Sequence, residues 1–587
     1  MKEITRPADA KVYASSVARR SFIKSGLGAA GAVAVAATSI ITSKKSAAKG
    51  GGDDNVPGAQ KPRFPPSPVT TPFKDPLFVL QPIQWVDLAG TTGLPSPMPS
   101  ADSGRGEIGR ARHQAWGSNA PQKYYEMHVR EADHRFHSDM PTSKIWGFNG
   151  QFPGPLFHSR YGTPELIRIY NDLPQNIVGF GTPQITTHLH NMHTPSESDG
   201  FPGDWFSPYV AGPTLTAPGY FRDHHYPMVY AGGDPREALG TLWYHDHTEN
   251  FTAPNVYRGM AGFHPIFDEI DSGNEQDSNS HALRLPSGAY DVPLMFMDFQ
   301  FDTSGAAQFD TFGNDGMLGD KFTVNGVIQP YFQVEPRKYR FRMLAPGPSR
   351  FYEFYLVNNG VNQQFTYISN DGNLLPAPIR NATKVRLGVA ERADIVIDFS
   401  KYPMGTSLFI VNKLEQLNGR GPTGNILQPG TQMLRFDIVK PLAGPDYSQV
   451  PDALRALPDI DPAGAVAQRS FTFKRTNAFW SVNDRVFDVN NPLATPKRGT
   501  SEIWTLSNQG DWSHPVHIHF EEGRILQRNG VAPPLHEQGR KDVYVLPPNS
   551  SVKVYLRFRD FVGKYACHCH NVVHEDHAMM FRWDIVD

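Results

Sequence analysis

Near its C-terminal end the chain reads Tyr565-Ala566-Cys567-His568-Cys569-His570-Asn571-Val572-Val573-His574-Glu575-Asp576-His577-Ala578-Met579. Alternate residues of a β-strand point to opposite faces, so on a strand His568 and His570 face one way and the sulfur of Cys569 faces the other. A strand with this sequence can therefore serve two sites that lie back to back.

Three further pairs of histidines have the same spacing: His188-Leu189-His190, His245-Asp246-His247 and His517-Ile518-His519. With 22 histidines in 587 residues, chance would give roughly one such pair in the whole chain. On a strand each pair presents two imidazoles to one point, and imidazole is a good ligand for copper, zinc, iron and nickel. A single pair is more often a hydrogen-bonded structural feature, but four pairs together indicate metal binding.

The sulfur ligands indicate which metal is bound. His514 precedes the third pair, and His574 and Met579 follow Cys569. Two histidines, one thiolate and a distant thioether form the ligand set of a blue-copper electron-transfer site. Zinc also binds cysteine and histidine, but it has little use for a thioether and does no redox chemistry. We therefore predict copper, and we expect Cys567, the other cysteine, to be a packed thiol of the core.

The composition excludes several classes of protein. Lysine and arginine number 56 against 58 acidic residues, a net charge of −2, so nothing favours nucleic acid or an anionic membrane as a partner.

The chain has 52 Gly and 51 Pro, and short runs of β-branched and aromatic residues recur between turns, as in 321–326 and 552–558. This pattern predicts stacked β-sandwiches or barrels. Residues 104–120 are poor in apolar side chains and are expected to form a surface excursion.

The first 48 residues have the features of an export signal. Arg19-Arg20 precedes an apolar run from Ser25 to about Ser43 that is rich in Gly and Ala, and small residues follow. The paired arginines resemble a twin-arginine signal, which implies a bacterial protein that is exported folded and is periplasmic or secreted. A membrane anchor is the alternative, although the run is only marginally long enough to span a bilayer. No other stretch approaches that length, so we expect the mature protein not to be embedded in a membrane.

The histidine motifs resemble those of the multicopper oxidases. His514-Pro515-Val516-His517-Ile518-His519 and the segment from His568 to Met579 are similar to the C-terminal signatures of that family, and Trp243-Tyr244-His245-Asp246-His247 is similar to an N-terminal one. Residues 143–155 look like the start of its first domain, and Ala390-Glu391-Arg392-Ala393-Asp394 looks like a hallmark of its second. The resemblance covers nearly all of the chain after the leader and is closest to bacterial spore-coat laccases, bilirubin oxidases and phenoxazinone synthases.

The resemblance implies an all-β fold of three cupredoxin-like domains, each a Greek-key β-sandwich or barrel. We expect a twin-arginine signal peptide at 1–48 and domains at 49–270, 271–459 and 460–587. Copper motifs occur only in the first and third of these, and the middle stretch contains one histidine, His281. The middle domain should therefore be a copper-free spacer, and a trinuclear copper cluster should form between the first and third domains.

The ligands of the family carry over to this sequence position by position, which implies four copper ions per chain. The mononuclear type 1 copper would be bound by His514, Cys569, His574 and Met579. The type 2 copper would be bound by His188 and His517. The type 3 pair would be bound by His190, His245, His247, His519, His568 and His570.

The resemblance implies a laccase-like enzyme that oxidises phenols and aromatic amines one electron at a time, at or near His514 or His574. Four electrons would pass through Cys569 to the cluster and reduce one dioxygen to two waters. Asp199 and Glu575 look like the acidic residues near the cluster of the spore-coat type and are candidates for a proton relay. Asp199 could instead be only a turn residue, and Glu575 only a hydrogen-bond acceptor for a ligand histidine.

Other functions stay open at this point. The main alternative is a metallo-oxidase that acts on Mn(II), Fe(II) or Cu(I). With 15 methionines and no cluster beyond Met579-Met580, the sequence argues against Cu(I), while Glu521-Glu522 keeps Mn(II) open. A copper carrier would need only the type 1 ligands, and a two-domain nitrite reductase lacks the full set of four pairs. The sequence does not indicate the physiological donor or the oligomeric state.

Overall fold

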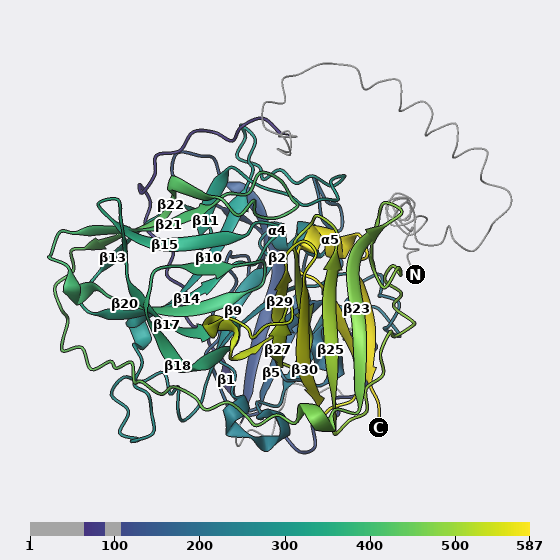
Figure 1. Cartoon of the computed structure of the whole chain (residues 1–587). Helices are drawn as coiled ribbons and strands as arrows, with labels where there is room; N and C mark the ends of the chain where they lie inside the picture. The colour runs from purple at the N-terminus through teal and green to yellow at the C-terminus, as the bar shows by residue number, and fades with distance from the viewer. Residues whose placement is uncertain (1–63, 89–106) are drawn as a thin grey trace. The chain divides into compact units, whose positions relative to one another are not determined.

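The computed structural model describes residues 64–88 and 107–587, so the signal predicted at 1–48 lies outside the described residues. The described residues are built almost entirely from β-strands and loops, which confirms the predicted all-β class (Figure 1). The α-helices among them are short: α3 Ser196–Asp199, α4 Thr252–Tyr257 and α5 Val572–Asp576. Single turns of 3-10 helix occur at η1 Ala231–Gly233, η2 Pro235–Glu237, η3 Gly288–Tyr290, η4 Phe399–Lys401, η5 Pro462–Gly464 and η6 Leu535–Glu537.

The strands between residues 86 and 267 form two sheets. One has the order β1-β2-β5-β7, with β3 beside β2, and the other has the order β4-β9-β8-β6. Their bounds are β1 Val86–Asp87, β2 Lys123–His134, β3 Ser143–Phe148, β4 Ser159–Arg160, β5 Glu165–Asn171, β6 Thr187–His190, β7 Phe221–Tyr226, β8 Thr241–Asp246 and β9 Ala261–Phe267. Side chains from both sheets pack in one core, among them Trp146, Leu189 and Tyr244. We call this unit the first sandwich.

A second sandwich follows between residues 291 and 438. Its sheets have the orders β12-β11-β10-β14-β20-β17-β18 and β13-β22-β21-β15-β16, with β19 beside β15. The bounds are β10 Asp291–Phe299, β11 Lys321–Val324, β12 Val327–Ile328, β13 Tyr331–Val334, β14 Lys338–Leu344, β15 Tyr352–Asn358, β16 Val361–Gln363, β17 Phe365–Asn370, β18 Asn373–Ala382, β19 Val385–Leu387, β20 Arg392–Asp398, β21 Ser407–Leu414 and β22 Ile426–Ile438. Phe341, Phe354 and Phe436 lie in its core.

A third sandwich contains the C-terminal strands. Its sheets have the orders β24-β23-β25-β30-β27-β28 and β29-β26-β31-β32, and β23, β25, β30 and β27 lie side by side in Figure 1. The bounds are β23 Ala467–Thr476, β24 Phe479–Val482, β25 Thr500–Gln509, β26 His514–Ile518, β27 Gly523–Arg528, β28 Arg540–Lys541, β29 Val543–Leu546, β30 Ser551–Phe558, β31 Gly563–Cys569 and β32 Met580–Ile585. Cys567 is a buried free thiol in the core of this sandwich, as predicted.

Each pair of sheets takes its strands from one continuous stretch of the chain. The first sandwich ends at Phe267 and the second begins at Asp291, while the second ends at Ile438 and the third begins at Ala467. The domain boundaries proposed at 270/271 and 459/460 stay predictions.

One of the predicted strand runs contains a turn. Residues 552–558 lie in β30 as expected, but β11 ends at Val324. Asn325 and Gly326 have positive φ angles of 50° and 73°, and Val324 pairs with Val327 across them. The run at 321–326 is therefore one strand followed by a two-residue hairpin turn, for which Asn-Gly is the favoured sequence.

The prediction that residues 104–120 form a surface excursion is correct for only part of the described segment, 107–120, in which residues 111–112 and 117–118 are exposed. Ile108 and His113 are buried, and Glu107 forms a β-bridge with Phe221 of β7. Polar residues enter the interior here because they pair with each other: Arg110 Nε lies 2.7 Å from Glu107 Oε1. A low content of apolar side chains did not reveal this pairing.

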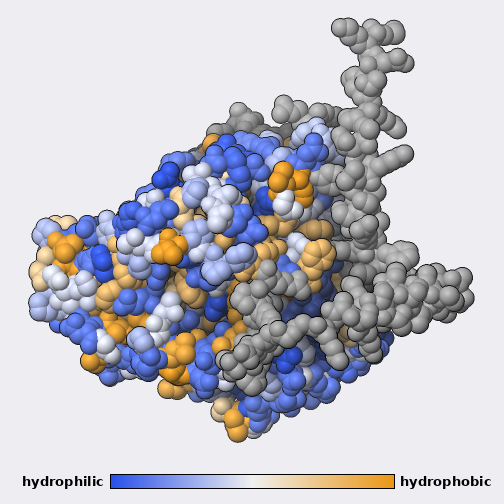
Figure 2. All heavy atoms as spheres, turned by 90° about the horizontal axis from the view of Figure 1, so that it is seen from above, coloured by the Kyte–Doolittle hydropathy of each residue, from blue (hydrophilic) through white to orange (hydrophobic). Residues whose placement is uncertain are grey.

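On the face shown in Figure 2, hydrophobic side chains lie singly or in small groups among hydrophilic ones, as is usual for protein surfaces. In residues 64–88 and 107–587, no helix has the length and apolar character needed to cross a bilayer.

Candidate metal centres

Two antiparallel strands of the third sandwich carry side chains that point to two different sites. β26 pairs with β31 so that His517 lies opposite His568 and Val516 lies opposite Cys569. Because strand side chains alternate, His517 and His568 project from one face of the sheet and Cys569 from the other. The structure thus places the thiol and the imidazoles on opposite sides of one strand.

On one face, Cys569 lies in a buried group with two histidines. Its Sγ is 3.4 Å from His514 Nδ1 and 3.6 Å from His574 Nδ1, and the two Nδ1 atoms are 3.2 Å apart. Met579 is fully buried in the same core, and its backbone oxygen accepts a hydrogen bond from the Cys569 N–H at 3.0 Å. Three donor atoms this close together fit one cation that prefers nitrogen and sulfur ligands. We call this group the mononuclear centre.

The histidines of the mononuclear centre do not reach solvent. His514 is 1% exposed and His574 is 0% exposed. Trp480 stacks on His574 with ring centroids 3.9 Å apart, and His574 Nε2 lies 3.1 Å from the backbone oxygen of Asp315, to which it donates. This hydrogen bond leaves His574 Nδ1 free toward Cys569. Trp480 and the backbone of Asp315 therefore cover the side of His574 that faces away from Cys569.

On the other face, eight histidines from the first and third sandwiches come together. β6 and β8 pair antiparallel so that His188 lies opposite His245, and all eight rings are 0% exposed. Their donor atoms form groups within 4.8 Å: His188, His517 and His519; His190, His245 and His570; and His247, His519 and His568. We call this set the histidine cluster.

Ring nitrogens in two of these groups point at one another. His188 Nε2 is 3.4 Å from His517 Nε2. His247 Nε2 is 3.1 Å from His519 Nε2 and 3.2 Å from His568 Nε2. Neutral imidazole nitrogens that face each other in this way present lone pairs, so a cation between them makes the arrangement favourable.

The remaining group, His190, His245 and His570, also favours a cation, because several of its ring nitrogens have no hydrogen-bond partner. His190 Nδ1, His245 Nε2 and both ring nitrogens of His570 are buried without a hydrogen-bond partner. Buried polar atoms are nearly always satisfied, so converging unsatisfied nitrogens mark a ligand site. An all-imidazole donor set is suited to copper, zinc, iron or nickel.

Metal-binding imidazoles must be neutral, and burial favours the neutral form of several of these rings. Burial lowers the pKa of His514 to about 3. Burial, reinforced by neighbouring histidines, also lowers the pKa well below its ordinary value for His188, His190, His245, His517, His519 and His570. The pKa of the Cys569 thiol is raised well above its ordinary value by burial, so its thiolate needs a metal cation as a partner.

The two acidic residues singled out in the sequence both contact the histidine cluster. Asp199 Oδ2 accepts a hydrogen bond from His519 Nδ1 at 2.8 Å, and Glu575 oxygens lie 3.1 Å from His247 Nδ1 and 2.8 Å from His568 Nδ1. These contacts favour the tautomers in which the other ring nitrogen faces the cluster. Burial raises the pKa of Asp199 well above its ordinary value.

Asp542 is a further residue at the cluster, and the sequence did not indicate it. Its Oδ1 lies 3.0 Å from His190 Nε2, and its backbone oxygen accepts a hydrogen bond from His517 Nδ1 at 2.9 Å. Asp542 is wholly buried and hydrogen-bonded to Arg392 of the second sandwich. No spacing or motif distinguishes it from the other acidic residues, so only the folded chain reveals its position.

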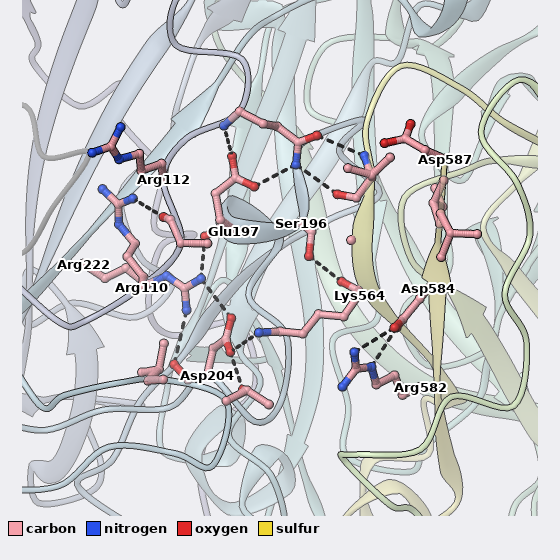
Figure 3. A pocket seen from close by; sticks show the side chains of 18 residues that line it. Arg110, Arg112, Ser196, Glu197, Asp204, Arg222, Lys564, Arg582, Asp584 and Asp587 are labelled. Carbon is pink, nitrogen blue, oxygen red and sulfur yellow. Dashed lines mark hydrogen bonds and ion pairs between the residues drawn. The ribbon is translucent and has the colours of Figure 1, made fainter.

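A cavity of about 610 Å³ lies beside helix α3. Ser196 and Glu197 of this helix line the cavity, and charged side chains in it pair with each other, as Lys564 does with Asp204 (Figure 3). The last residue of α3, Asp199, contacts the histidine cluster. One short helix therefore links the cavity to the cluster.

The fold and the two centres define a β-sandwich metalloprotein with a sulfur-containing mononuclear site and a separate histidine cluster. Family models described as "Multicopper oxidase" match residues 129–217 and 459–587. A laccase from Bacillus stratosphericus is 32% identical over 526 residues, which cover 80% of this chain and 96% of the laccase. A bilirubin oxidase from Albifimbria verrucaria is 33% identical over 473 residues, which cover 78% of this chain and 75% of that protein.

The chain belongs to the multicopper oxidase family, and it is a laccase-like member. The solved structure of a multi-copper oxidase from Pediococcus acidilactici has a TM-score of 0.68 and 21% identity, covering 91% of this chain and 96% of that chain. This likeness confirms the fold of three cupredoxin-like domains. Membership of the family implies that copper is the metal, and the histidine groups fit it.

Proposed function

We propose that the protein oxidises phenols or aromatic amines by single electrons and passes four electrons to dioxygen, which becomes two waters. The observation that carries the proposal is that β31 directs Cys569 to the mononuclear centre and its neighbour His568 to the histidine cluster, where His570 joins it. Four copper ions, when bound, would supply the one-electron redox chemistry and the dioxygen binding.

The proposed ligands follow the groups in the structure. The type 1 site would use His514, Cys569, His574 and Met579. The type 2 site would use His188 and His517. The type 3 pair would use His190, His245 and His570 on one side and His247, His519 and His568 on the other. Cys569 is bonded through the peptide backbone to the flanking histidines, so an electron has a short covalent path from the thiolate to the cluster.

The surface over the mononuclear centre supports an organic aromatic donor. Trp480, which stacks on His574, contacts the partly exposed ring of Trp512 edge-on at 5.2 Å. The guanidinium groups of Arg420 and Arg475 lie 4.9 Å and 5.5 Å from the centre of the Trp512 ring. Flat aromatic groups and cations suit the stacking of a planar, electron-rich donor.

Mn(II), one of the alternative donors, finds less support in the arrangement of charges. Glu521 and Glu522, which the sequence left open as ligands for Mn(II), are 2% and 7% exposed. Glu521 pairs with Arg559, and Glu522 Oε2 lies 2.7 Å from Arg540 Nη1. Buried carboxylates that are already paired with arginines do not form an open site for a cation from solvent.

Asp199 and Glu575 would relay the protons that dioxygen reduction consumes. Although Glu575 is buried, the facing rings of His568 and His247 lower its pKa well below its ordinary value, so it would act as a carboxylate that accepts a proton and passes it on. We expect Glu575→Gln to keep the blue absorption of cysteine-bound copper while slowing oxygen uptake by about 10–100-fold. Glutamine has a similar shape, but it carries no transferable proton, and it presents only one accepting oxygen to His247 and His568. Oxygen uptake at saturating donor, with the visible spectrum recorded on the same sample, measures the effect. Unchanged uptake would remove Glu575 from the reaction.

We also propose that the protein is exported in folded form by the twin-arginine route and acts in the periplasm or outside the cell. The support is the sequence alone, with Arg19-Arg20 before an apolar run. Folded export suits a protein that takes up its metal before it crosses the membrane.

The proposed function is tested with purified, copper-loaded protein. We expect copper in both centres and oxygen uptake with a phenol and with an aromatic amine, at rates well above those with Mn(II), Fe(II) or Cu(I). Rapid turnover of a metal ion with slow turnover of every organic donor would establish the metallo-oxidase instead. Copper in the mononuclear centre alone, without oxygen uptake, would indicate an electron carrier.

A further inference from the structure

The second sandwich reaches the histidine cluster through the side chain of Arg392, the first residue of β20. Arg392 is 0% exposed, and its Nη1 and Nη2 donate to the two carboxylate oxygens of Asp542, the first at 2.7 Å. Its Nε donates to the backbone oxygen of Thr241 at 3.2 Å, where β8 begins. A planar guanidinium bound to both oxygens fixes a carboxylate in position and in rotation.

The carboxylate that Arg392 fixes belongs to the residue that orients two rings of the cluster. Asp542 Oδ1 lies 3.0 Å from His190 Nε2, which leaves His190 Nδ1 directed toward its metal group. The backbone oxygen of Asp542 accepts from His517 Nδ1 at 2.9 Å, which leaves His517 Nε2 directed toward His188. Asp542 therefore orients histidines of two different groups in the cluster.

The second sandwich also holds the backbone around Asp542. Asp371, which follows β17, accepts hydrogen bonds from the N–H groups of Asp542 at 3.2 Å and Val543 at 3.1 Å. Lys541 Nζ lies 3.0 Å from Asp371 Oδ2, and both side chains are 0% exposed. Because every group here is buried and paired, Asp542 has little freedom to move without breaking several contacts.

We propose that Arg392 is a positioning residue for the histidine cluster: it fixes Asp542, and Asp542 sets the orientation of His190 and His517. The middle domain, which supplies no ligand, would thereby set the metal affinity of a cluster built by its two neighbours. The mononuclear centre lies on the other face of β26 and β31 and should not depend on Arg392. The inference rests on the proposed copper sites.

The first test uses Arg392→Met in the full copper-loaded chain. We expect copper in the cluster to bind about 10–100-fold more weakly, as is typical when an outer partner of a ligand histidine is lost. The blue absorption of the mononuclear centre should be unchanged. Graded amounts of a chelator, with electron paramagnetic resonance for histidine-bound copper and visible absorption for the cysteine site, separate the two centres.

Arg340→Met is the matched control. Arg340 is equally buried in the second sandwich, and it binds Asp271 and Asp394, with Nη2 of Arg340 2.6 Å from Asp394 Oδ2. The variant Arg340→Met should lower the free energy of unfolding without lowering the copper affinity of the cluster. Arg392→Lys keeps the charge but binds Asp542 at one point, so its affinity should lie between those of the wild type and Arg392→Met. If Arg392→Met does not fold, Arg392→Lys is compared with Asp542→Asn, which should lose the larger fraction of cluster copper.

A double variant tests whether Arg392 acts through Asp542. The losses of Arg392→Met and Asp542→Asn should not multiply when both are combined. The inference would be overturned if the double variant lost copper affinity by the product of the two single losses. Equal loss of copper from both centres would also overturn it. Full retention of cluster copper by Arg392→Met would also overturn it, while leaving the proposed oxidase intact. A wild-type chain that binds no copper in the cluster would instead overturn the proposed function.

Discussion

Replacing Cys569 by serine should abolish the blue absorption of the copper-loaded protein and lower oxidase turnover by more than about 100-fold. The Cys569 sulfur is the thiol that lies 3.4 Å and 3.6 Å from His514 and His574, and it begins the covalent path to the cluster. A serine hydroxyl does not ionise at neutral pH and is a poor ligand for copper. Removal of a hydrogen-bond partner of a ligand typically lowers activity by about 10–100-fold. We expect a larger loss of turnover here, because Cys569 is itself a ligand. Visible spectra and oxygen uptake measure both effects.

Cys567→Ala is the control for this variant. Cys567 is buried on the same strand and faces the same side as Cys569, but the structure places it in the apolar core and not in a metal group. It should keep the blue absorption and most of the turnover. Persistence of the blue absorption in Cys569→Ser would contradict the assignment of the mononuclear centre.

Replacing His247 by alanine should produce the complementary defect, with loss of copper from the histidine cluster and retention of the blue absorption. His247 Nε2 lies within 3.2 Å of both His519 and His568, so its removal opens one group of the cluster. Oxygen uptake should fall by more than about 100-fold, because a direct ligand is lost. An aromatic donor should still bleach the blue absorption when oxygen is absent. Copper per chain and anaerobic bleaching measure the two outcomes.

His264→Gln is the matched control in the same sandwich. His264 is also buried, but it stacks on Phe157 and contacts Ser159 at 2.6 Å, away from the metal groups. It should keep both the copper content and the oxygen uptake. If His247→Ala reduced oxygen at the wild-type rate, the cluster could not be the site of that reaction.

Local spacing made the histidine groups predictable. Each His-X-His pair lies at or beside a strand, where alternation alone brings two rings to one side. The placement of Cys569 on the opposite face of β31 follows from the same rule. The all-β class followed from short β-branched and aromatic runs. The run 321–326 ends in a hairpin turn, which its Asn-Gly sequence could have indicated.

Contacts between distant parts of the chain could not be predicted in this way. Asp542, Arg392 and Asp371 meet only in the folded protein, and none of them has a neighbour in sequence that indicates a role at the cluster. The covering of His574 depends on strand β24 of the third sandwich, which carries Trp480, and on the loop between β10 and β11 of the second, which carries Asp315. The burial of residues near 107 was missed because Glu107 and Arg110 pair with each other inside the protein.

We propose that one strand, β31, serves two copper sites on its opposite faces. Anomalous X-ray diffraction from crystals of the copper-loaded chain, recorded on both sides of the copper absorption edge, tests it most directly. We expect one copper peak between Cys569, His514 and His574 and separate copper peaks among the eight histidines on the other face. A map without copper at either position, or with a single peak on one side of the strand, would contradict the account.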